Sequence, residues 1–402
     1  MIYDFIHSKR QVLSKVENSS WASEMVLNPA IIEDRDTGRI HMLFRATGPW
    51  PEKGLPGKPL PFPIFLGYGW SDDKGATWSF DKEEPALVPA LSYEPEEIYI
   101  TDYQGRKVVN HSNGCIEDPR LFYFEDGFCY MTAACRMFPP GPYWENDRPT
   151  QCAPDWVMTP ANPFGAAASE NVTVNVLFKV NLLKLSEKKY SEAFEYITNV
   201  TDAKFGEDRD VLFFPERLSI TGKKKIIMLQ RPFMPEKYPF INQDLLPSIM
   251  ICAADSFEDF TNPVLHREVL AVPVFEWEKN RIGGSTPPIK TGDGEWLLNY
   301  HGKQDAEVGY TQSFMILKEQ DNGFPVITHR CSERMIIADK SWEMPGKFKT
   351  PCVFITGMIR LEDKLLAAYG AADEKIGLLE IEYPELLNYL NNMKKVNSIT
   401  NR

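Results

Sequence analysis

Short polar clusters interrupt the apolar runs of this sequence, and they hold the side chains that could do chemistry. Segment 114–120 places Glu117, Asp118 and Arg120 at the start of a strand-like run. Because Asp118 precedes a proline, its backbone is biased toward an extended conformation that projects the carboxylate rather than letting it cap a helix. Asp373 closes another such run near the C-terminus. Taken alone, residues of this kind are more often salt-bridged groups at strand ends than catalytic ones.

Basic side chains recur at or beside strand ends in a protein that is otherwise acidic. Lysine and arginine together number 44 against 56 acidic residues, which gives a net charge of −12. The basic residues in question are Arg45, Arg209, Arg231, Arg281 and His301. Converging arginines make a seat for an oxyanion, because the planar guanidinium forms paired hydrogen bonds to it. An aspartate beside such a seat suggests chemistry with phosphate rather than with water.

No competing signature accompanies these clusters. The sequence contains no HExxH, GxSxG or GxxxxGK[ST] motif. The 6 histidines show no metal-ligand spacing and the 7 cysteines form no CxxC, so we expect no metal and no disulfide frame. The acidic balance argues against nucleic-acid binding, and no apolar run of about 18 residues could span a membrane. The N-terminus lacks an apolar leader, which predicts a cytoplasmic protein.

The elements that must position these residues are short strands. Apolar runs bounded by turn residues recur through most of the chain, and several are joined by acidic-glycine turns such as 125–127. Helical periodicity is convincing only at the two ends, around 3–17 and 384–395. The sequence therefore predicts an all-β fold with short terminal helices.

One segment gives a sharper architectural prediction. Residues 71–78 fit S-x-D-x-G-x-T-W, the Asp-box hairpin found on blades of several β-propellers. In this structural motif Asp73 caps the turn, Gly75 supplies a left-handed backbone and Trp78 packs beneath the blade. A weaker echo at 253–262 indicates a second blade. We expect about five blade-like units of roughly 40–50 residues each, and hence a five-bladed β-propeller, whose closed ring removes sheet edges.

No linker divides the chain, so we expect residues 1–402 to form a single catalytic domain. Residues 1–20 would be an N-terminal helical arm and 384–402 a C-terminal helix. Segment 137–170 is rich in proline and aromatic residues and too long for a plain connector. It is expected to be a loop over a site or a subunit contact, and together with the terminal helices it offers contacts for a homo-oligomer.

Taken in order, the clusters resemble glycoside hydrolase family 130, the mannoside phosphorylases, whose fold is a five-bladed β-propeller. The motifs that carry the resemblance are NPAI (28–31), FRATG (44–48), EDPRL (117–121), DRDVLFFPER (208–217), LQRP (229–232), RIGGSTPPIKT (281–291), LNYHG (298–302) and YGAAD (369–373). Each motif alone is weak, whereas all of them in the right order are specific. The resemblance implies cleavage of β-mannosidic bonds, β-1,4 or β-1,2, by inorganic phosphate, giving α-mannose 1-phosphate with inversion.

The resemblance also implies residue roles. Asp118 would be the single general acid, acting through the 3-hydroxyl of the sugar, because phosphate is already an anionic nucleophile and needs no second catalytic carboxylate. The positions that match the phosphate seat are Arg209, Arg231, Arg281, His301 and Tyr310, with Arg281 standing where many members carry lysine. The positions that match the −1 mannose contacts are Asn28, Arg45 and Asp373. No cofactor or metal is implied; the expected partners are a β-mannoside oligosaccharide and phosphate, with no nucleic acid and no membrane.

Three alternatives stay open at this point. A minority of the family hydrolyse β-1,2-mannosides, having lost basic residues and gained carboxylates that activate water. This chain keeps the basic set, which favours phosphorolysis, although Glu207, Asp208 or Glu216 beside the seat could serve as a base. If the protein were a non-catalytic sugar-binding propeller, Asp118 would be a relic without a catalytic role. An arabinanase-like hydrolase would need three converging carboxylates, and the sequence offers only Asp118 and Asp373 clearly.

Overall fold

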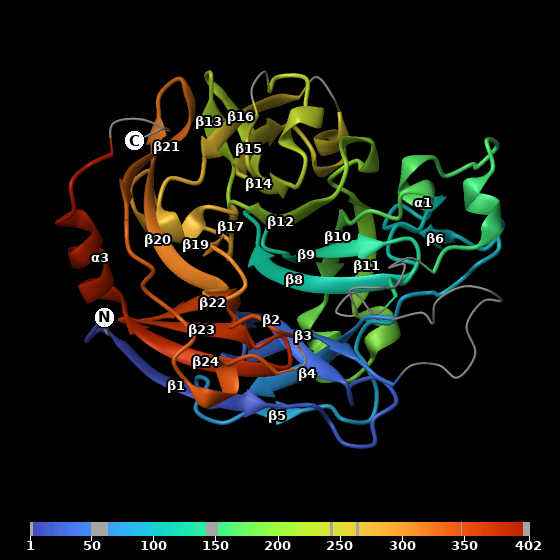
Figure 1. The fold of residues 1–402 in the computed structure, drawn as a ribbon, viewed down its shortest axis with the longest axis horizontal. Helices are drawn as coiled ribbons and strands as arrows, with labels where there is room; N and C mark the ends of the chain where they lie inside the picture. The colour runs from blue at the N-terminus through green and yellow to red at the C-terminus, as the bar shows by residue number, and fades with distance from the viewer. Residues whose placement is uncertain are drawn as a thin grey trace.

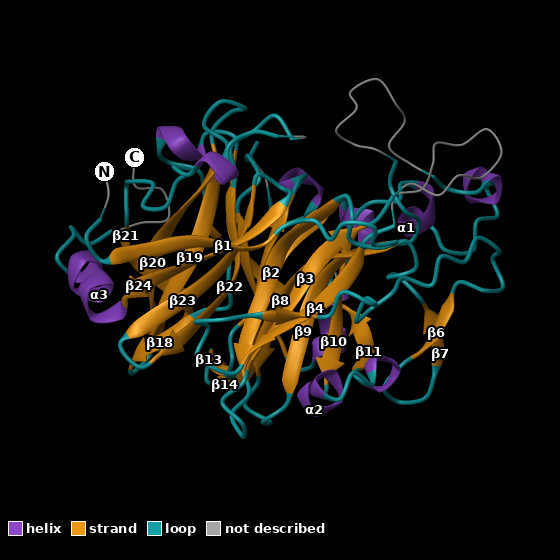
Figure 2. Cartoon of the chain, turned by 90° about the horizontal axis from the view of Figure 1, so that it is seen from below, coloured by secondary structure: helices purple, strands orange, loops and turns teal. Residues whose placement is uncertain are grey.

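The computed structural model describes residues 3–49, 63–141, 152–241, 244–262, 265–346 and 348–396. They form five small antiparallel sheets grouped around a centre (Figure 1), which confirms the predicted five-bladed β-propeller. A sixth, two-stranded sheet of β6 (Tyr99–Thr101) and β7 (Lys107–Val109) lies to one side of the ring, near α1 (Ala166–Ser169) (Figure 2). No helix among these residues has the length and apolar character needed to cross a membrane.

Four of the blades are meanders that run outward from the centre in chain order. The first is β2 (Met25–Glu33), β3 (Ile40–Thr47), β4 (Phe65–Ser71) and β5 (Ser79–Phe80). The second is β8 (Cys115–Tyr123), β9 (Cys129–Arg136), β10 (Val174–Val180) and β11 (Phe194–Asn199). The third is β12 (Asp208–Phe213), β14 (Lys223–Pro232), β15 (Ile249–Ala254) and β16 (His266–Ala271), with β13 (Leu218–Ile220) beside β14. The fourth is β17 (Arg281–Gly284), β19 (Glu295–Lys303), β20 (Tyr310–Gln320) and β21 (Gly323–Arg330), with β18 (Ile289–Gly292) beside β19.

The fifth blade joins the two ends of the chain. It consists of β22 (Val353–Leu361), β23 (Lys364–Ala371) and β24 (Lys375–Glu382), with β1 (Ile6–Leu13) as its outer strand. The helix predicted over 3–17 is therefore wrong. Residues 6–13 pair with β24 instead, because the hydrogen bonds and core contacts of a distant sheet edge outweigh local helical periodicity. The predicted C-terminal helix is present as α3 (Tyr383–Asn391).

The hydrophobic core lies between the blades rather than within one layer. Five clusters of buried residues each combine side chains from two neighbouring blades, such as Phe122 and Phe213, or Leu298 and Leu229. A strand in such a stack is covered on both faces, which explains why β14 contains a continuous apolar run at 226–229 instead of an alternating one. Closing the ring therefore buries apolar surface at five interfaces.

The Asp-box prediction is confirmed by its hydrogen bonds. Asp73 accepts from the backbone N–H of Thr77 at 2.8 Å, Gly75 has a φ of +88°, and Trp78 donates its indole N–H to the Gly75 carbonyl at 3.0 Å. This turn joins β4 to β5. The echo at 253–262 joins β15 to β16, the same pair of positions in another blade.

The segment predicted as a loop over a site is described at 137–141 and 152–170, while 142–151 lie outside the described residues. Its Phe138 and Val157 pack with Ala167 and Ala168 of α1 in a small cluster of their own. Pro140 reaches the cavity described below. A further short helix, α2 (Leu182–Ser186), connects β10 to β11. The subunit contacts and the homo-oligomer stay predictions.

Candidate active site

A cavity of about 360 Å³ lies where the innermost strands of the blades converge. All five blades contribute to its wall, so the ring must close before the wall is complete. The lining residues are Asn28, Arg45, Ile64, Glu117, Asp118, Arg136, Pro140, Glu207, Arg209, Asp210, Arg231, Phe233, Tyr310, Cys352, Phe354 and Asp373.

Three innermost strands aim a polar side chain into the cavity with the same local device. Asn28 on β2, Asp118 on β8 and Asp210 on β12 have φ angles of 47°, 53° and 57°. Each lies at a break in ladder register, between residues 27 and 30, 117 and 120, and 209 and 212. The extended backbone expected at Asp118 from the proline after it is therefore wrong, because the residue lies in a bulge. A bulge of this kind re-aims a side chain, and the left-handed backbone costs about 1 kcal/mol or more at each non-glycine residue. Such strain is typical of functional positions.

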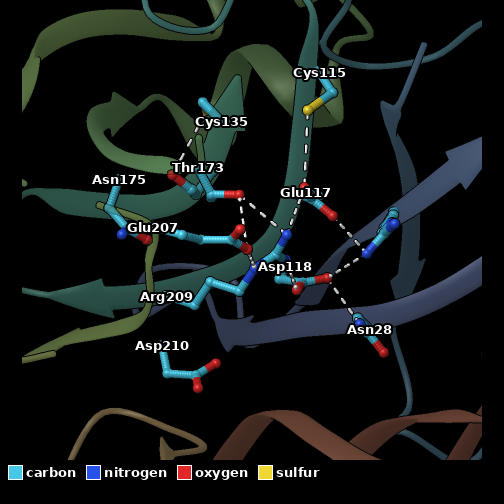
Figure 3. Close-up of polar contacts among 12 residues, drawn as sticks. Asn28, Cys115, Glu117, Asp118, Cys135, Thr173, Asn175, Glu207, Arg209 and Asp210 are labelled. Atoms are coloured by element: carbon cyan, nitrogen blue, oxygen red, sulfur yellow. Dashed lines mark hydrogen bonds and ion pairs between the residues drawn. The ribbon is translucent and has the colours of Figure 1, made fainter. Parts of the chain in front are cut away.

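The Asp118 carboxylate receives donors from three directions (Figure 3). Asn28 donates its amide N–H at 2.7 Å, Arg45 Nη1 lies 3.1 Å away, and Arg209 Nη1 lies 3.5 Å from the other oxygen. Burial raises the pKa of Asp118, but the positive charges of Arg45, Arg209 and Arg120 outweigh burial, and the pKa lies below its ordinary value. Asp118 is therefore ionised in the free protein.

Two further carboxylates hold the arginines beside Asp118. Arg209 Nε pairs with Glu207 at 2.7 Å and its Nη2 lies 3.4 Å from Glu117, while Arg45 pairs with Glu117 at 2.7 Å (Figure 3). Burial opposes ionisation of Glu207, yet Arg209 and Arg136 lower its pKa to about 2. Glu117 and Glu207 thus act as fixed anions that position the cations.

Asp210 organises the basic residues on the other side of the cavity. Arg231 binds its Oδ2 through Nε at 2.8 Å and Nη2 at 2.7 Å, and His301 Nε2 lies 3.3 Å from the same oxygen. Arg120 Nη2 approaches Oδ1 at 3.4 Å. Burial opposes ionisation, but Arg231 and His301 bring the pKa of Asp210 far below its ordinary value. A Cβ at Gly283 would overlap both Asp210 and His301, so this contact requires glycine.

Arg281 is held by aromatic rings. Its guanidinium lies 5.1 Å from the Phe233 ring centre and 5.8 Å from that of Tyr310, and Arg231 lies 4.2 Å from the Phe233 ring. These are cation–π distances. Lys303 pairs with Arg281 across the strands, and burial followed by the Arg281 charge lowers the pKa of Lys303. Lys303 is thus a further cation beside Arg281 that the sequence analysis did not identify.

Asp373 lines the same cavity as Asp118. It has a φ of 54°, and Cys352 donates its thiol to Oδ1 at 3.5 Å. Burial raises the pKa of Asp373 above its ordinary value although Arg45 opposes the shift. A Cβ at Gly370 would overlap the amide of Asn28, so the backbone of β23 must approach that side chain closely.

Most of the predicted site residues come together. Seven of them line the cavity: Asn28, Arg45, Asp118, Arg209, Arg231, Tyr310 and Asp373. Arg281 and His301 are not among the lining residues, but Arg281 contacts Tyr310 and His301 contacts Asp210. The sequence analysis assigned no role to Asp210, Arg136, Phe233 or Phe354. Asp210 occupies the same place at the start of its blade as Asn28 and Asp118 occupy in theirs, and this correspondence is the signal that could have identified it.

The acids that flank the seat in sequence separate in space. Glu216 pairs with Lys290 at 2.6 Å and does not line the cavity. Asp208 accepts from the Tyr238 hydroxyl at 3.0 Å, and burial raises its pKa to about 7. Of the three acids that flank the seat in sequence, only Glu207 lines the cavity. The expectation that few carboxylates converge is wrong, since Glu117, Glu207 and Asp210 join Asp118 and Asp373, each of the three paired with arginine.

This arrangement can bind an oxyanion beside a carboxylate. The guanidinium groups of Arg209 and Arg231 line the same cavity as Asp118. The cavity wall also holds hydrogen-bonding groups suited to hydroxyls, those of Asn28, Arg45 and Asp373. Among the described residues no group of three or more His, Cys, Asp or Glu side chains could hold a metal ion.

Comparison with known proteins gives consistent matches. The family model Glyco_hydro_130, described as beta-1,4-mannooligosaccharide phosphorylase, matches residues 164–392. A 1,2-beta-oligomannan phosphorylase from Thermoanaerobacter sp. is 25% identical over 95% of this chain and 97% of its own. A beta-1,2-mannobiose phosphorylase from Listeria innocua is 25% identical over 77% of this chain and 84% of its own.

The solved structures agree on the fold. The beta-1,2-mannobiose phosphorylase of Listeria innocua in complex with beta-1,2-mannobiose superimposes with a TM-score of 0.62 at 19% identity, covering 94% of this chain and 95% of the other. At that level of identity the likeness supports the five-bladed propeller.

Proposed function

The chain belongs to glycoside hydrolase family 130, and we propose that it cleaves β-mannosides with inorganic phosphate to give α-mannose 1-phosphate with inversion. The whole propeller would act as one catalytic unit, because residues of all five blades line the cavity. Phosphate would be a co-substrate rather than a cofactor. The named relatives, which are phosphorylases of β-1,2- and β-1,4-linked mannosides, support the substrate class.

The observation that carries the proposal is the position of Arg209. This residue contacts Asp118 at 3.5 Å and lines the same cavity as Arg231, so the candidate acid and the candidate phosphate seat share one cation. A phosphate bound by Arg209 and Arg231 would therefore sit directly beside Asp118. Such placement converts a bimolecular displacement into one between groups already held in contact.

The same geometry explains how an ionised Asp118 becomes an acid. A phosphate dianion competes with Asp118 for Arg209 and adds negative charge nearby, and both effects raise the pKa of the carboxyl group. The protonated Asp118 then gives its proton to the 3-hydroxyl of the sugar, whose own proton passes to the leaving oxygen as a phosphate oxygen bonds to C1 and the C1–O bond breaks. The P–OH proton of the incoming phosphate is released on ester formation and can restore Asp118. Asn28, Arg45 and Asp373 would hold the −1 mannose.

The contacts weigh against hydrolysis. A hydrolase needs a carboxylate that is free to activate water, as inverting glycosidases do. Glu207 is occupied by Arg209 at 2.7 Å, and the arginines lower its pKa to about 2, which makes it a weak base. Asp208 and Glu216, the other two candidates from sequence, do not line the cavity.

The test is the dependence of mannoside cleavage on phosphate concentration, measured with β-1,2- and β-1,4-mannobiose. The wild-type rate should rise from zero and saturate. Arg231→Gln should raise the phosphate concentration for half saturation about tenfold to a hundredfold, since one charged hydrogen-bonding group is worth about 1.5–3 kcal/mol. Arg217→Gln, an outer arginine paired with Glu125, is the matched control and should not change it. Cleavage without phosphate would refute phosphorolysis.

A further inference from the structure

His301 is the one predicted seat residue whose ring is completely buried, and its two nitrogens have different surroundings. Nδ1 lies 3.1 Å from the hydroxyl of Ser285. Nε2 lies 3.3 Å from Asp210 Oδ2, but the geometry is not that of a hydrogen bond, and Nε2 has no hydrogen-bond partner among the described residues. One nitrogen is thus engaged, and the other faces the Asp210 carboxylate without a hydrogen-bond partner among the described residues.

A chain of hydrogen bonds fixes which nitrogen carries the proton. Gln312 must donate from Nε2 to the Val353 carbonyl at 2.8 Å, because a carbonyl only accepts. Its Oε1 therefore faces Ser285, which donates its single hydroxyl proton there at 2.8 Å. The Ser285 oxygen can then only accept from His301, so the proton of the neutral ring lies on Nδ1.

Charged groups from three other strands face the ring. Asp210 on β12 favours the protonated form, whereas Arg231 on β14 and Arg120 on β8 disfavour it. Burial is the largest influence and lowers the pKa of His301 below its ordinary value. Apart from these charges, the rings of Tyr310 and Phe354 pack against the imidazole. His301 is accordingly neutral in the free protein.

We propose that Ser285 and Gln312 are positioning residues that keep the proton of neutral His301 on Nδ1, so that the bare Nε2 takes up a proton when phosphate enters the seat. The step moves one proton from solvent to the ring and leaves the phosphate dianion unchanged. Phosphate draws Arg231 away from Asp210, and the new N–H of His301 then compensates the Asp210 carboxylate. The inference rests on the proposed phosphorylase function, but its first half concerns the free protein.

Nitrogen-15 NMR of histidine-labelled protein without phosphate tests that first half. His301→Asn identifies the His301 signals among those of the 6 histidines. We expect a neutral ring with the proton on Nδ1 in the wild type. In Ser285→Ala the Nδ1 acceptor is lost, and the proton should move to Nε2, where the Asp210 carboxylate 3.3 Å away attracts it electrostatically. Thr286→Val removes a neighbouring buried hydroxyl that has no hydrogen-bond partner among the described residues and should change nothing.

A wild-type ring with its proton on Nε2 would overturn the proposal, and this measurement needs no variant of Ser285 to fold. The second half is tested by phosphate binding between about pH 8 and 9.5, where free phosphate stays a dianion. The Asp118→Asn background is used because its amide cannot take up a proton. Linkage to one proton predicts a Kd for phosphate that rises with pH, by at most about tenfold per pH unit and only while the pH is below the pKa of His301 in the complex. Adding Ser285→Ala should flatten this slope, because Nε2 then carries a proton already.

The outcomes separate the two proposals. A phosphate Kd that does not change with pH in the Asp118→Asn background overturns the proton uptake at His301. Failure of the wild type to bind phosphate at any pH overturns the phosphorylase function, whereas the NMR tautomer in the free protein still decides the role of Ser285 and Gln312.

Discussion

Replacing Asp118 by asparagine isolates the proton that the carboxyl group supplies. Asn28, Arg45 and Arg209 converge on this side chain. Both arginines keep another carboxylate at 2.7 Å, Glu117 for Arg45 and Glu207 for Arg209, so the substitution leaves no buried charge without a partner. We therefore expect the fold and the phosphate seat to survive, and the lost rate to report proton transfer.

General acid catalysis contributes typically 10²–10⁴-fold, which corresponds to about 3–5.5 kcal/mol of transition-state stabilisation. Asp118→Asn should lower kcat for mannobiose by that factor. A dinitrophenyl β-mannoside, whose leaving group needs no proton, should lose less than about tenfold. The assay is the initial rate of both substrates at saturating phosphate, with a thermal melt to verify folding.

Asp373→Asn is the matched control, because it makes the same change at another carboxylate that lines the cavity. As the proposed sugar anchor, Asp373 should affect both substrates equally and mainly through KM. An Asp118→Asn enzyme that loses less than tenfold on mannobiose, or that loses as much on the activated substrate, would refute the assignment of the acid.

Three further predictions follow from single contacts. Arg45 and Arg209 hold the pKa of Asp118 below its ordinary value, and bound phosphate raises it, so the high-pH limb of kcat/KM for the mannoside should move to higher pH as phosphate increases. Glu278→Ala removes the partner of the buried Arg330 at 2.8 Å and should lower the free energy of unfolding, measured in urea, by about 3–5 kcal/mol. Gly370→Ala should push away the Asn28 amide and lower kcat/KM about tenfold or more, with phosphate binding unchanged.

Each of these has a matched comparison. Raising the ionic strength with chloride, in the absence of sulfate, should leave the high-pH limb of kcat/KM where it is. A high-pH limb that does not move when phosphate is added would contradict the linkage. Glu276→Ala, an exposed acid next to Glu278 in the chain, should change stability by less than about 0.5 kcal/mol. Gly292→Ala adds a methyl group where no atom lies within 4 Å and should leave kcat/KM intact; equal effects of the two glycine variants would argue against the Asn28 contact.

The fold was predictable because its signals are local. Apolar runs bounded by turns, together with the Asp box around Asp73, depend on residues close in the chain, and both proved correct. Strand β1 was not predictable in this way. Its eight residues become a strand only because β24, some 370 positions later, offers a free edge on which ring closure depends.

The site residues also differ in whether the sequence alone could identify them. Asp118, Arg209 and Arg231 stand in short motifs, and the structure brings them to one cavity. Asp210 stands in the motif at 208–217 but received no role there, because its importance arises from Arg231 and His301, which come from other strands. The pairing of Glu207 with Arg209, which argues against a water-activating base, is likewise visible only in the structure.

The most direct test of the central claim is phosphorus-31 NMR of the wild-type enzyme acting on β-mannobiose in phosphate buffer. Phosphorolysis beside Asp118 predicts that inorganic phosphate falls as a single sugar phosphate with the α configuration rises in equal amount. Free mannose accumulating while the phosphate signal stays constant would contradict the account.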